Sequence, residues 1–208
     1  MEEEWKIKFV KWFEDEIADS NKPLDEHWDV EVKEENENIW IKAENPKNPF
    51  SIFVNLYRGF ASLQIYTGLE TKFLDSEERL RIYGTLLILN GKWKMVKYVL
   101  AGTKDEIIIV TDLDLSSLSK EEFSHALTVT LFAFYDMINE LGLEEGYEML
   151  QLGHIYEIIT RKSEEGKTKE EIAEYIEKTL GIEHEVAKEM VNAVLKGDSS
   201  DKNLKGYV

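Results

Sequence analysis

The 208-residue sequence contains no cysteine, and this absence excludes several kinds of chemistry. A chain without thiols has no disulfide, no thiol nucleophile and no thiolate ligand for a metal ion. Proline is also scarce: Pro23 is expected to end an N-terminal helix, while Pro46 and Pro49 interrupt a run of strands. Glycine-rich phosphate loops and the Gly-x-Ser-x-Gly pattern of serine hydrolases are missing as well. The sequence therefore carries no catalytic signature.

Positive charge is in short supply. Lys and Arg number 25 against 42 Asp and Glu, which gives a formal net charge of −17. A surface this acidic repels nucleic-acid phosphates and anionic lipids on average, so neither is expected as a partner. Basic protein segments are more compatible with it.

Long apolar runs are missing too. The N-terminus, Met-Glu-Glu-Glu-Trp, lacks the basic and then apolar pattern of a signal peptide. The most apolar helical stretch, residues 126–138, is too short to cross a membrane and is interrupted by Thr128, Thr130, Tyr135 and Asp136. Without these two patterns, we expect a soluble, cytoplasmic protein. Since hydrophobic residues still make up 43 % of the chain, we also expect a substantial core.

Hydrophobic periodicity divides the chain into an α+β part and a helical part. Up to residue 142 we expect a helix, four strands, a helix, two strands and a helix. Their ranges are 4–19, then 27–34, 38–44, 50–57 and 60–67, then 75–90, then 93–101 and 106–112, then 119–142. The remainder is helical in pattern, with helices at 144–162, 169–180 and 184–196.

Three helices are expected to begin with capping boxes, at residues 75–78, 119–122 and 168–171. In each, a Ser, Thr or Asp is followed three residues later by Glu, so that side chains and first-turn amides satisfy each other. The helix at 75–90 is expected to end at Asn90-Gly91. Its predicted buried residues are Leu80, Tyr83, Leu86 and Leu87.

The hairpin at residues 50–67 is apolar on both faces. One row, which we assign to the core, consists of Ile52, Val54, Leu56, Leu63 and Ile65. The other consists of Phe53, Tyr57, Phe60 and Tyr66, with Trp40 joining from the preceding strand and Tyr98 or Trp93 as further candidates. A two-residue turn at Arg58-Gly59 sets a register that pairs Tyr57 with Phe60, Val54 with Leu63 and Ile52 with Ile65.

The order of elements and three segments resemble the YbjN-like proteins, which share the fold of type III secretion chaperones. The segments are Leu-Leu-Ile-Leu-Asn-Gly (86–91), Ile-Val-Thr-Asp-Leu-Asp-Leu (109–115) and Leu-Ser-Lys-Glu-Glu-Phe-Ser-His-Ala-Leu (118–127). The resemblance covers residues 4–142. It implies a twisted antiparallel sheet with helices on one face and a non-enzymatic, chaperone-like or regulatory binding role, and it brings no catalytic residue, cofactor or metal.

We therefore expect an α+β domain over residues 1–142 and an α-helical extension over residues 143–208. The expected activity is the binding of a protein client by a homodimer, on the apolar face formed by Trp40, Phe53, Tyr57, Phe60 and Tyr66. Each large aromatic side chain can bury about 150–250 Å², and a monomer rarely leaves several of them bare in one patch. Coverage of this face by the C-terminal helices or by a second subunit is the favoured alternative to a client groove.

Asp112 and Asp114 suggest a different function. An apolar strand followed by Asp-x-Asp resembles the first motif of haloacid-dehalogenase-type phosphotransferases, where both carboxylates lie at Mg²⁺ and one attacks phosphorus. That motif belongs on a central parallel strand and is followed by a glycine turn. Here it ends an expected antiparallel meander and is followed by Leu115-Ser116-Ser117, so an enzyme is disfavoured.

The four histidines, His27, His125, His154 and His184, are not spaced as metal ligands. His125 and His154 are expected to be hydrogen-bonded packing residues near the core. No zinc or other metal site is predicted.

The helices at 169–180 and 184–196 have the outline of a helix-turn-helix. The second of them carries Glu183, Glu185 and Glu189, whereas a recognition helix needs donors for phosphates and base edges. We expect instead a helical hairpin, or an arm that docks on another protein. Its inward residues are predicted to be Ile172, Ile176, Leu180, Val191 and Val194.

Overall fold

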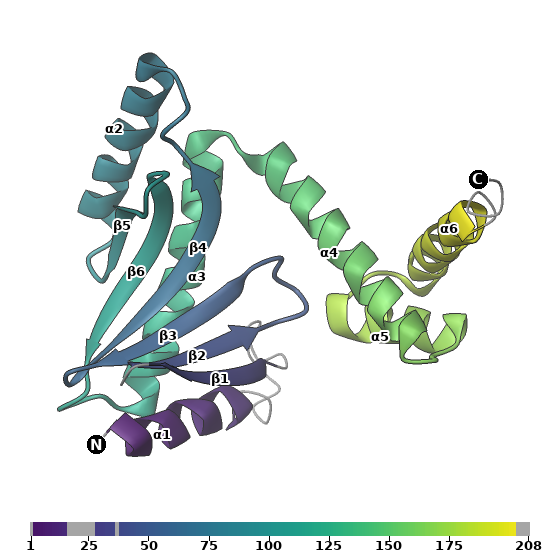
Figure 1. Ribbon diagram of the computed structural model, residues 1–208, viewed down its shortest axis with the longest axis horizontal. Helices are drawn as coiled ribbons and strands as arrows, with labels where there is room; N and C mark the ends of the chain where they lie inside the picture. Colours follow the sequence, from purple (N-terminus) through teal and green to yellow (C-terminus); the bar gives the residue numbers. More distant parts are fainter. Residues whose placement is uncertain (1, 16–27, 36–37, 203–208) are drawn as a thin grey trace. The chain divides into compact units, whose positions relative to one another are not determined.

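Figure 1 shows a computed structural model of the chain, which describes residues 2–15, 28–35 and 38–202. The chain divides into two compact units, residues 1–145 and 146–208, and each is described by itself. Within the described ranges, no helix combines the length and the apolar character needed to cross a membrane.

The described part of the N-terminal unit is built on a six-stranded antiparallel sheet with the strand order β1-β2-β3-β4-β6-β5. The strands are β1 (Asp29–Glu35), β2 (Asn38–Glu44), β3 (Ser51–Tyr57), β4 (Phe60–Glu70), β5 (Val96–Ala101) and β6 (Glu106–Asp114). The predicted α+β class and the order of elements are confirmed (Figure 1).

Helices α1 (Glu2–Asp15), α2 (Ser76–Lys92) and α3 (Lys120–Leu141) pack against this sheet. In Figure 1, α3 runs behind the strands and contacts β4, β5 and β6, while α1 contacts β2 and β3. Phe9 and Phe13 of α1 are fully buried, and their ring centroids lie 5.1 and 5.2 Å from that of Phe123 in α3. This edge-on aromatic cluster ties the two helices together. The predicted helix end at Asn21-Lys22-Pro23 lies outside the described residues.

The β3–β4 hairpin has the predicted register. Tyr57 pairs with Phe60, Val54 with Leu63 and Ile52 with Ile65. Both central residues of the turn have positive φ, 47° at Arg58 and 86° at Gly59, which is the backbone of a type I′ turn. The twist of the strands favours this turn, although positive φ is energetically unfavourable for Arg.

The inner face of the sheet is the core of this unit. Its fully buried residues include the whole predicted row, Ile52, Val54, Leu56, Leu63 and Ile65. Burying each such side chain contributes about 1.5–3 kcal/mol. In β6, which lies between β4 and β5, Ile107, Ile108 and Ile109 are all buried, so this part of the strand is covered on both faces.

A pair of hydroxyl groups is buried between α3 and β6. The Oγ1 atoms of Thr111 and Thr130 lie 2.7 Å apart, and both residues are fully buried. The Thr130 hydroxyl also donates to the carbonyl oxygen of Ala126 at 2.7 Å, so Thr111 is the donor in the pair. Both groups are thus satisfied, which offsets the free energy lost on removing them from water.

Asn90 of α2 closes the outer edge of β5. Its Oδ1 accepts a hydrogen bond from the Tyr98 N–H at 2.8 Å, and its Nδ2 donates to the Tyr98 carbonyl oxygen at 3.2 Å. A further strand would make the same two bonds to this residue. The helix continues through Asn90 and Gly91 to Lys92, one residue beyond the predicted end at about Asn90-Gly91.

The C-terminal unit consists of α4 (Glu144–Glu164), α5 (Lys169–Leu180) and α6 (His184–Lys202). Its core contains Ile159, Ile172, Ala173, Ile176, Ala187 and Val191, with Leu180 and Val194 partly buried against it. The inward face predicted for the helical pair is therefore confirmed.

The capping boxes form to different extents. In α5 the full box is present, because Thr168 accepts from the Glu171 N–H at 3.3 Å and Glu171 accepts from the Thr168 N–H at 2.8 Å. In α2, Asp75 accepts from the first-turn amides, and in α3 Ser119 accepts from the Glu122 N–H. All three helices begin where predicted.

Candidate partner-binding surfaces

The residues predicted to bind a partner lie on the outer face of the sheet, opposite the inner core row. Trp40 comes from β2, Phe53 and Tyr57 from β3, and Phe60 and Tyr66 from β4; we call this set the aromatic face. Alternation along each strand places them there, because their neighbours in sequence are buried in the core. Tyr57, Phe60 and Tyr66 are 49, 55 and 39 % exposed, while Trp40 and Phe53 are half-buried.

The aromatic face contains two pairs rather than one continuous row. Tyr57 and Phe60 are direct cross-strand partners beside the turn. Phe53 and Tyr66 pack edge-on farther along the hairpin, with ring centroids 5.4 Å apart. Between the pairs lie Asn55 and Ser62, which oppose each other on β3 and β4. On β3 and β4 a bound segment would therefore meet two apolar areas separated by polar side chains, with Trp40 beside Asn55 on β2.

Hydrogen bonds connect Ser62 to polar side chains on either side of it. The Tyr66 hydroxyl donates to Gln64 Oε1 at 3.1 Å, and Gln64 Nε2 donates to Ser62 Oγ at 3.3 Å. Ser62 Oγ donates to Asp112 Oδ1 at 2.9 Å, and Lys97 Nζ donates to Asp112 Oδ2 at 2.7 Å. Burial alone would raise the pKa of Asp112, but the bonds from Lys97 and Ser62 outweigh it and leave that pKa below its ordinary value.

Asp112 and Asp114 do not have the setting of a phosphotransferase site. Strand β6 is antiparallel to both of its neighbours, β4 and β5. Asp112 is engaged by Lys97 and Ser62, and Asp114 accepts a hydrogen bond from the Ser116 N–H at 2.8 Å. Among the described residues, no group of three or more His, Asp or Glu side chains is placed to hold a metal ion. The acids belong to the polar part of the outer face.

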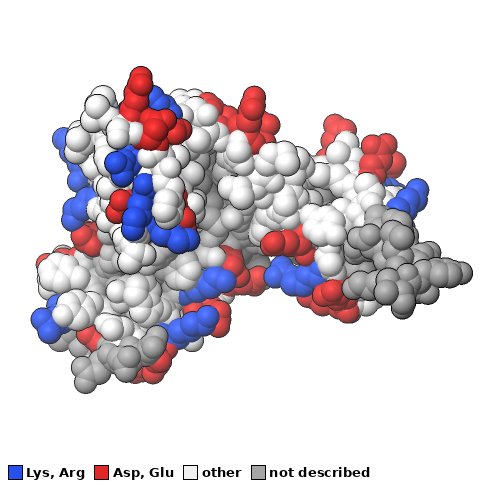
Figure 2. Space-filling model, turned by 45° about the horizontal axis from the view of Figure 1, so that its top comes forward, with Lys and Arg blue, Asp and Glu red and all other residues white. Residues whose placement is uncertain are grey.

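Charged side chains near the aromatic face are paired. Lys42 lies 2.7 Å from Glu44, and the guanidinium carbon of Arg58 lies 4.8 Å from the ring centroid of Tyr57. Figure 2 shows acidic and basic side chains interspersed with uncharged surface on the face in view. The excess of acid is therefore not gathered into one patch on that face.

Tyr98 and Trp93 do not join the aromatic face. Tyr98 is buried on the inner side, where its hydroxyl donates to the carbonyl oxygen of Ala133 at 2.7 Å. Burial and the nearby charge of Asp136 raise the pKa of Tyr98 well above its ordinary value. Trp93 precedes β5, and its Nε1 donates to Asp136 at 2.9 Å. Neither candidate fits: Trp93 lies before β5, which begins at Val96, and Tyr98 pairs with the inward-facing Ile109.

The histidines are scattered. His27 lies outside the described residues, and His125 is exposed on α3, contrary to its predicted place near the core. His154 is half-buried on α4. His184 lies 2.6 Å from Glu177 and 3.1 Å from Glu170, and these two carboxylates raise the pKa of its imidazole.

A second apolar surface, which the sequence reasoning missed, is the outward face of α2. The helix buries Ile82, Leu86 and Leu89, so Leu80 and Leu87, predicted to be inside, point outward. Leu80, Leu87 and Ile88 are 74, 71 and 74 % exposed. The sequence does contain the pattern of one helical face. Counted from Leu80, residues at spacings of four, seven, eight and eleven are Gly84, Leu87, Ile88 and Gly91.

Gly84 lies at the middle of this outward face of α2. A Cβ atom added there would meet no heavy atom within 4 Å, so packing inside the chain does not require glycine. Glycine in a helix interior costs about 0.8–1 kcal/mol relative to alanine. Gly84 lowers the stability of α2 although no contact within the chain requires glycine there. Such a glycine is consistent with close approach of another backbone.

Comparisons with known proteins place most of the chain in one family. Residues 8–141 match the model of a domain of unknown function, DUF8183, and the chain belongs to that family. Residues 142–208 match a second model, HTH_78, also described as a domain of unknown function. No curated protein matches the chain. Membership of the YbjN-like family, predicted from the sequence motifs, stays a prediction.

Solved structures provide likenesses at low sequence identity. An uncharacterized protein from Methanothermobacter thermautotrophicus is similar at a TM-score of 0.50 and 12 % identity, over 68 % of this chain and 98 % of that one. YbjN from E. coli, a putative transcription regulator by its title, has a TM-score of 0.46 and 13 % identity, over 66 and 91 % of the two chains. A chain of the ExsC–ExsE complex has a TM-score of 0.37 and 13 % identity, over 62 and 90 %. The first of these likenesses shows a shared fold.

Proposed function

We propose that this chain is a non-enzymatic protein-binding module, chaperone-like or regulatory, that holds an apolar segment of a partner on the aromatic face. The observation that carries the proposal is the exposed cross-strand pair of Tyr57 and Phe60 on a sheet whose other face is already filled. Large aromatic side chains contribute most to interface energetics and are usually covered. The proposed domain division, 1–142 and 143–208, places this face wholly in the first domain.

Binding would occur on the face of the sheet rather than by addition of a strand to its edge. At β5 the Asn90 side chain already occupies the outward N–H and C=O groups of Tyr98. At the other edge, β1 has the sequence Asp-Val-Glu-Val-Lys-Glu-Glu, and charged edge strands resist pairing. The affinity would then come from side-chain burial, and the net charge of −17 would favour clients with basic flanks.

A homodimer is part of the proposal, and the outward face of α2 is the best supported interface for it. If two copies of α2 cross antiparallel with Gly84 at the two-fold axis, Leu80 of one chain meets Ile88 of the other, because each is four residues from Gly84. Such an isologous contact is self-complementary. It would cover the most exposed aliphatic side chains of α2 and leave the aromatic face free for a client.

The test uses the double substitution Tyr57→Ser and Phe60→Ser in the full chain. Binding of fluorescent twelve-residue peptides with apolar centres and lysine flanks is measured by anisotropy. The double variant should bind about tenfold more weakly, as expected for loss of a central aromatic contact. Its free energy of unfolding should fall by only about 1 kcal/mol, because the pair stabilises the hairpin to that extent.

Phe73→Ser provides the matched control, since Phe73 is 77 % exposed in the same unit but lies outside the aromatic face. It should bind peptides like the unchanged chain. Equal losses in both variants, or none in the double variant, would refute capture on the aromatic face.

A second candidate function, nucleic-acid binding by the C-terminal unit, is suggested by the label of its family model and by its geometry. α5 and α6 are joined by a short turn that begins with Gly181 at φ 67°, as in helix-turn-helix motifs. The exposed residues of α6 include Glu185 and Glu189, which would face phosphates with the wrong charge. We therefore favour docking of these helices on a protein.

A further inference from the structure

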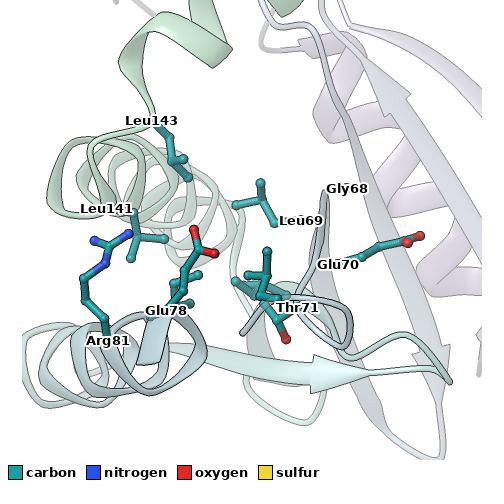
Figure 3. Close-up of a pocket in the computed structure, with 11 residues that line it drawn as sticks. Gly68, Leu69, Glu70, Thr71, Glu78, Arg81, Leu141 and Leu143 are labelled. Atoms are coloured by element: carbon teal, nitrogen blue, oxygen red, sulfur yellow. The ribbon is translucent and has the colours of Figure 1, made fainter. Parts of the chain in front are cut away.

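A pocket of about 350 Å³ opens in the N-terminal unit, away from the aromatic face (Figure 3). It lies where the end of β4, the first turns of α2 and the end of α3 meet over Ile107 of β6. Leu69 of β4, Leu141 at the end of α3 and Leu143 just after that helix form its walls, as the close-up shows. Its volume falls at the lower end of the range of small-molecule sites, about 300–1,000 Å³.

An irregularity in β4 creates the space. Tyr66 pairs with Ile108 but Glu70 pairs with Glu106, so β4 has three residues where β6 has one. Gly68 lies in this bulge with φ 71°. A strand that bulges here leaves its partner, which separates the two strands over Ile107.

The groups freed by this bulge are satisfied by side chains. The Thr67 hydroxyl donates to the Ile107 carbonyl oxygen at 2.7 Å and accepts from the Leu69 N–H at 3.1 Å. The Gly68 N–H donates to Glu106 Oε1 at 3.1 Å. The opening is therefore held in place before any ligand arrives, and a pre-formed site loses less entropy on binding.

The pocket has an apolar interior and a charged rim. The Thr71 hydroxyl in the wall is already bonded to the Tyr83 hydroxyl and to the Asp105 carbonyl oxygen. Glu78 and Arg81 stand exposed at the rim, and within the described part of the chain neither side chain has a hydrogen bond or an ion pair. One carboxylate and one guanidinium are thus available beside an apolar space.

We propose that this pocket binds a free α-amino acid with an apolar side chain. The side chain enters the space lined by Leu69, Ile107 and Leu141, the ammonium group faces Glu78, and the carboxylate faces Arg81. A simple carboxylic acid would place its charge beside Glu78, and a simple amine would place its charge beside Arg81. Only a zwitterion satisfies both groups, and an apolar side chain suits a space lined by Leu69, Ile107 and Leu141.

The test is calorimetric titration of the full chain with leucine and three analogues, each lacking one part of it. The analogues are 4-methylpentanoate, which lacks the ammonium group, 3-methylbutylamine, which lacks the carboxylate, and glycine, which lacks the side chain. Leucine should bind saturably at one site per chain, and each analogue about tenfold more weakly or not at all.

Substitutions connect binding to the pocket. Glu78→Gln and Arg81→Gln should each weaken leucine binding about tenfold, and Leu69→Trp should abolish it by filling the space. Glu77→Gln and Arg79→Gln are matched controls on the same helix that do not line the pocket, and they should bind leucine unchanged. Far-ultraviolet circular dichroism checks that every variant is folded.

Three results would overturn the proposal. They are no saturable leucine binding, equal affinity for leucine and 4-methylpentanoate, and undiminished binding by the folded Leu69→Trp chain. Peptide capture on the aromatic face should be the same in all five variants, so the two activities are tested independently.

Discussion

At the scale of single residues, Asn90 makes the two hydrogen bonds to the edge strand β5 that a neighbouring strand would otherwise make. An edge strand offers a row of unpaired backbone groups to any other chain, which is a route to aggregation. Asn90 occupies both outward groups of Tyr98 with one amide, because an amide side chain presents a donor and an acceptor as a backbone does. Among side chains, only Asn and Gln carry this carboxamide, and Gln is one methylene longer.

Replacing Asn90 should therefore destabilise the fold and expose the edge. Asn90→Ala leaves both Tyr98 groups unpaired, and Asn90→Asp keeps the acceptor but loses the donor. Each should lower the free energy of unfolding by about 1–3 kcal/mol, measured by urea denaturation, and should increase light scattering on storage. Asn139→Ala, on the exposed side of α3, is the control and should change neither quantity. Unchanged stability in both Asn90 variants would contradict an edge-closing role.

At the scale of elements, one substitution on the outward face of α2 should raise the stability of the chain and weaken the dimer. Gly84→Ala should stabilise the isolated chain by up to about 1 kcal/mol, because it improves helix propensity and meets no neighbouring atom. The same Cβ should hold two crossing helices apart and weaken a dimer several-fold. Thermal unfolding at low concentration measures the first effect, and sedimentation equilibrium measures the second.

Gly153→Ala is the matched control, because Gly153 also lies inside a helix with open space around it but belongs to α4. It should raise stability without changing the mass in solution. A chain that remains monomeric at millimolar concentration, or a Gly84→Ala chain that dimerises as tightly as before, would exclude α2 as the interface.

The hairpin and α2 show what could and could not be predicted from the sequence. In β3 and β4, side chains alternate with a period of two and a two-residue turn fixes the register, so one consistent pairing existed. In α2, aliphatic residues lie on both sides of the helix, and Leu80 with Leu87 has the same spacing as Ile82 with Leu89. Periodicity alone could not choose the buried side, which is decided by contact with β5 and α3.

The pocket was also beyond prediction, for a different reason. Strand β4 was predicted to end at residue 67, three residues short of its actual end, and Gly68 is the only turn signal beside the irregularity. The bulge depends on how β4 pairs with β6, a strand about forty residues later, and on support from Thr67 and Glu106. Such pairing is a tertiary property. The placement of Trp40 was predictable, in contrast, because it follows from strand phase alone.

At the scale of the whole molecule, charge favours protein docking over DNA binding as the role of the C-terminal unit. The net charge is −17, and α6 exposes Glu185 and Glu189 where a recognition helix would contact DNA. The full chain should show no saturable binding to a 20-base-pair duplex at 50 mM salt, measured by fluorescence anisotropy. Proteins that bind DNA non-specifically reach dissociation constants of about 10⁻⁴–10⁻⁶ M even at physiological salt. Saturable binding that weakens steeply with salt would identify a nucleic-acid partner instead.

The buried bond between Thr111 and Thr130 has a consequence beyond the core. Apolar contacts are not directional, so a purely aliphatic interface would let α3 settle at several positions along the sheet. Any slide would leave the Thr111 hydroxyl without its acceptor, at a cost of about 1–3 kcal/mol, whereas Thr130 would keep its bond to Ala126 in the same helix. Leu141 lies farther along the same helix, and a shift by one residue would carry it about 1.5 Å along the axis. The hydroxyl pair therefore favours one position of α3 along the sheet, and with it the position of Leu141 in the pocket wall.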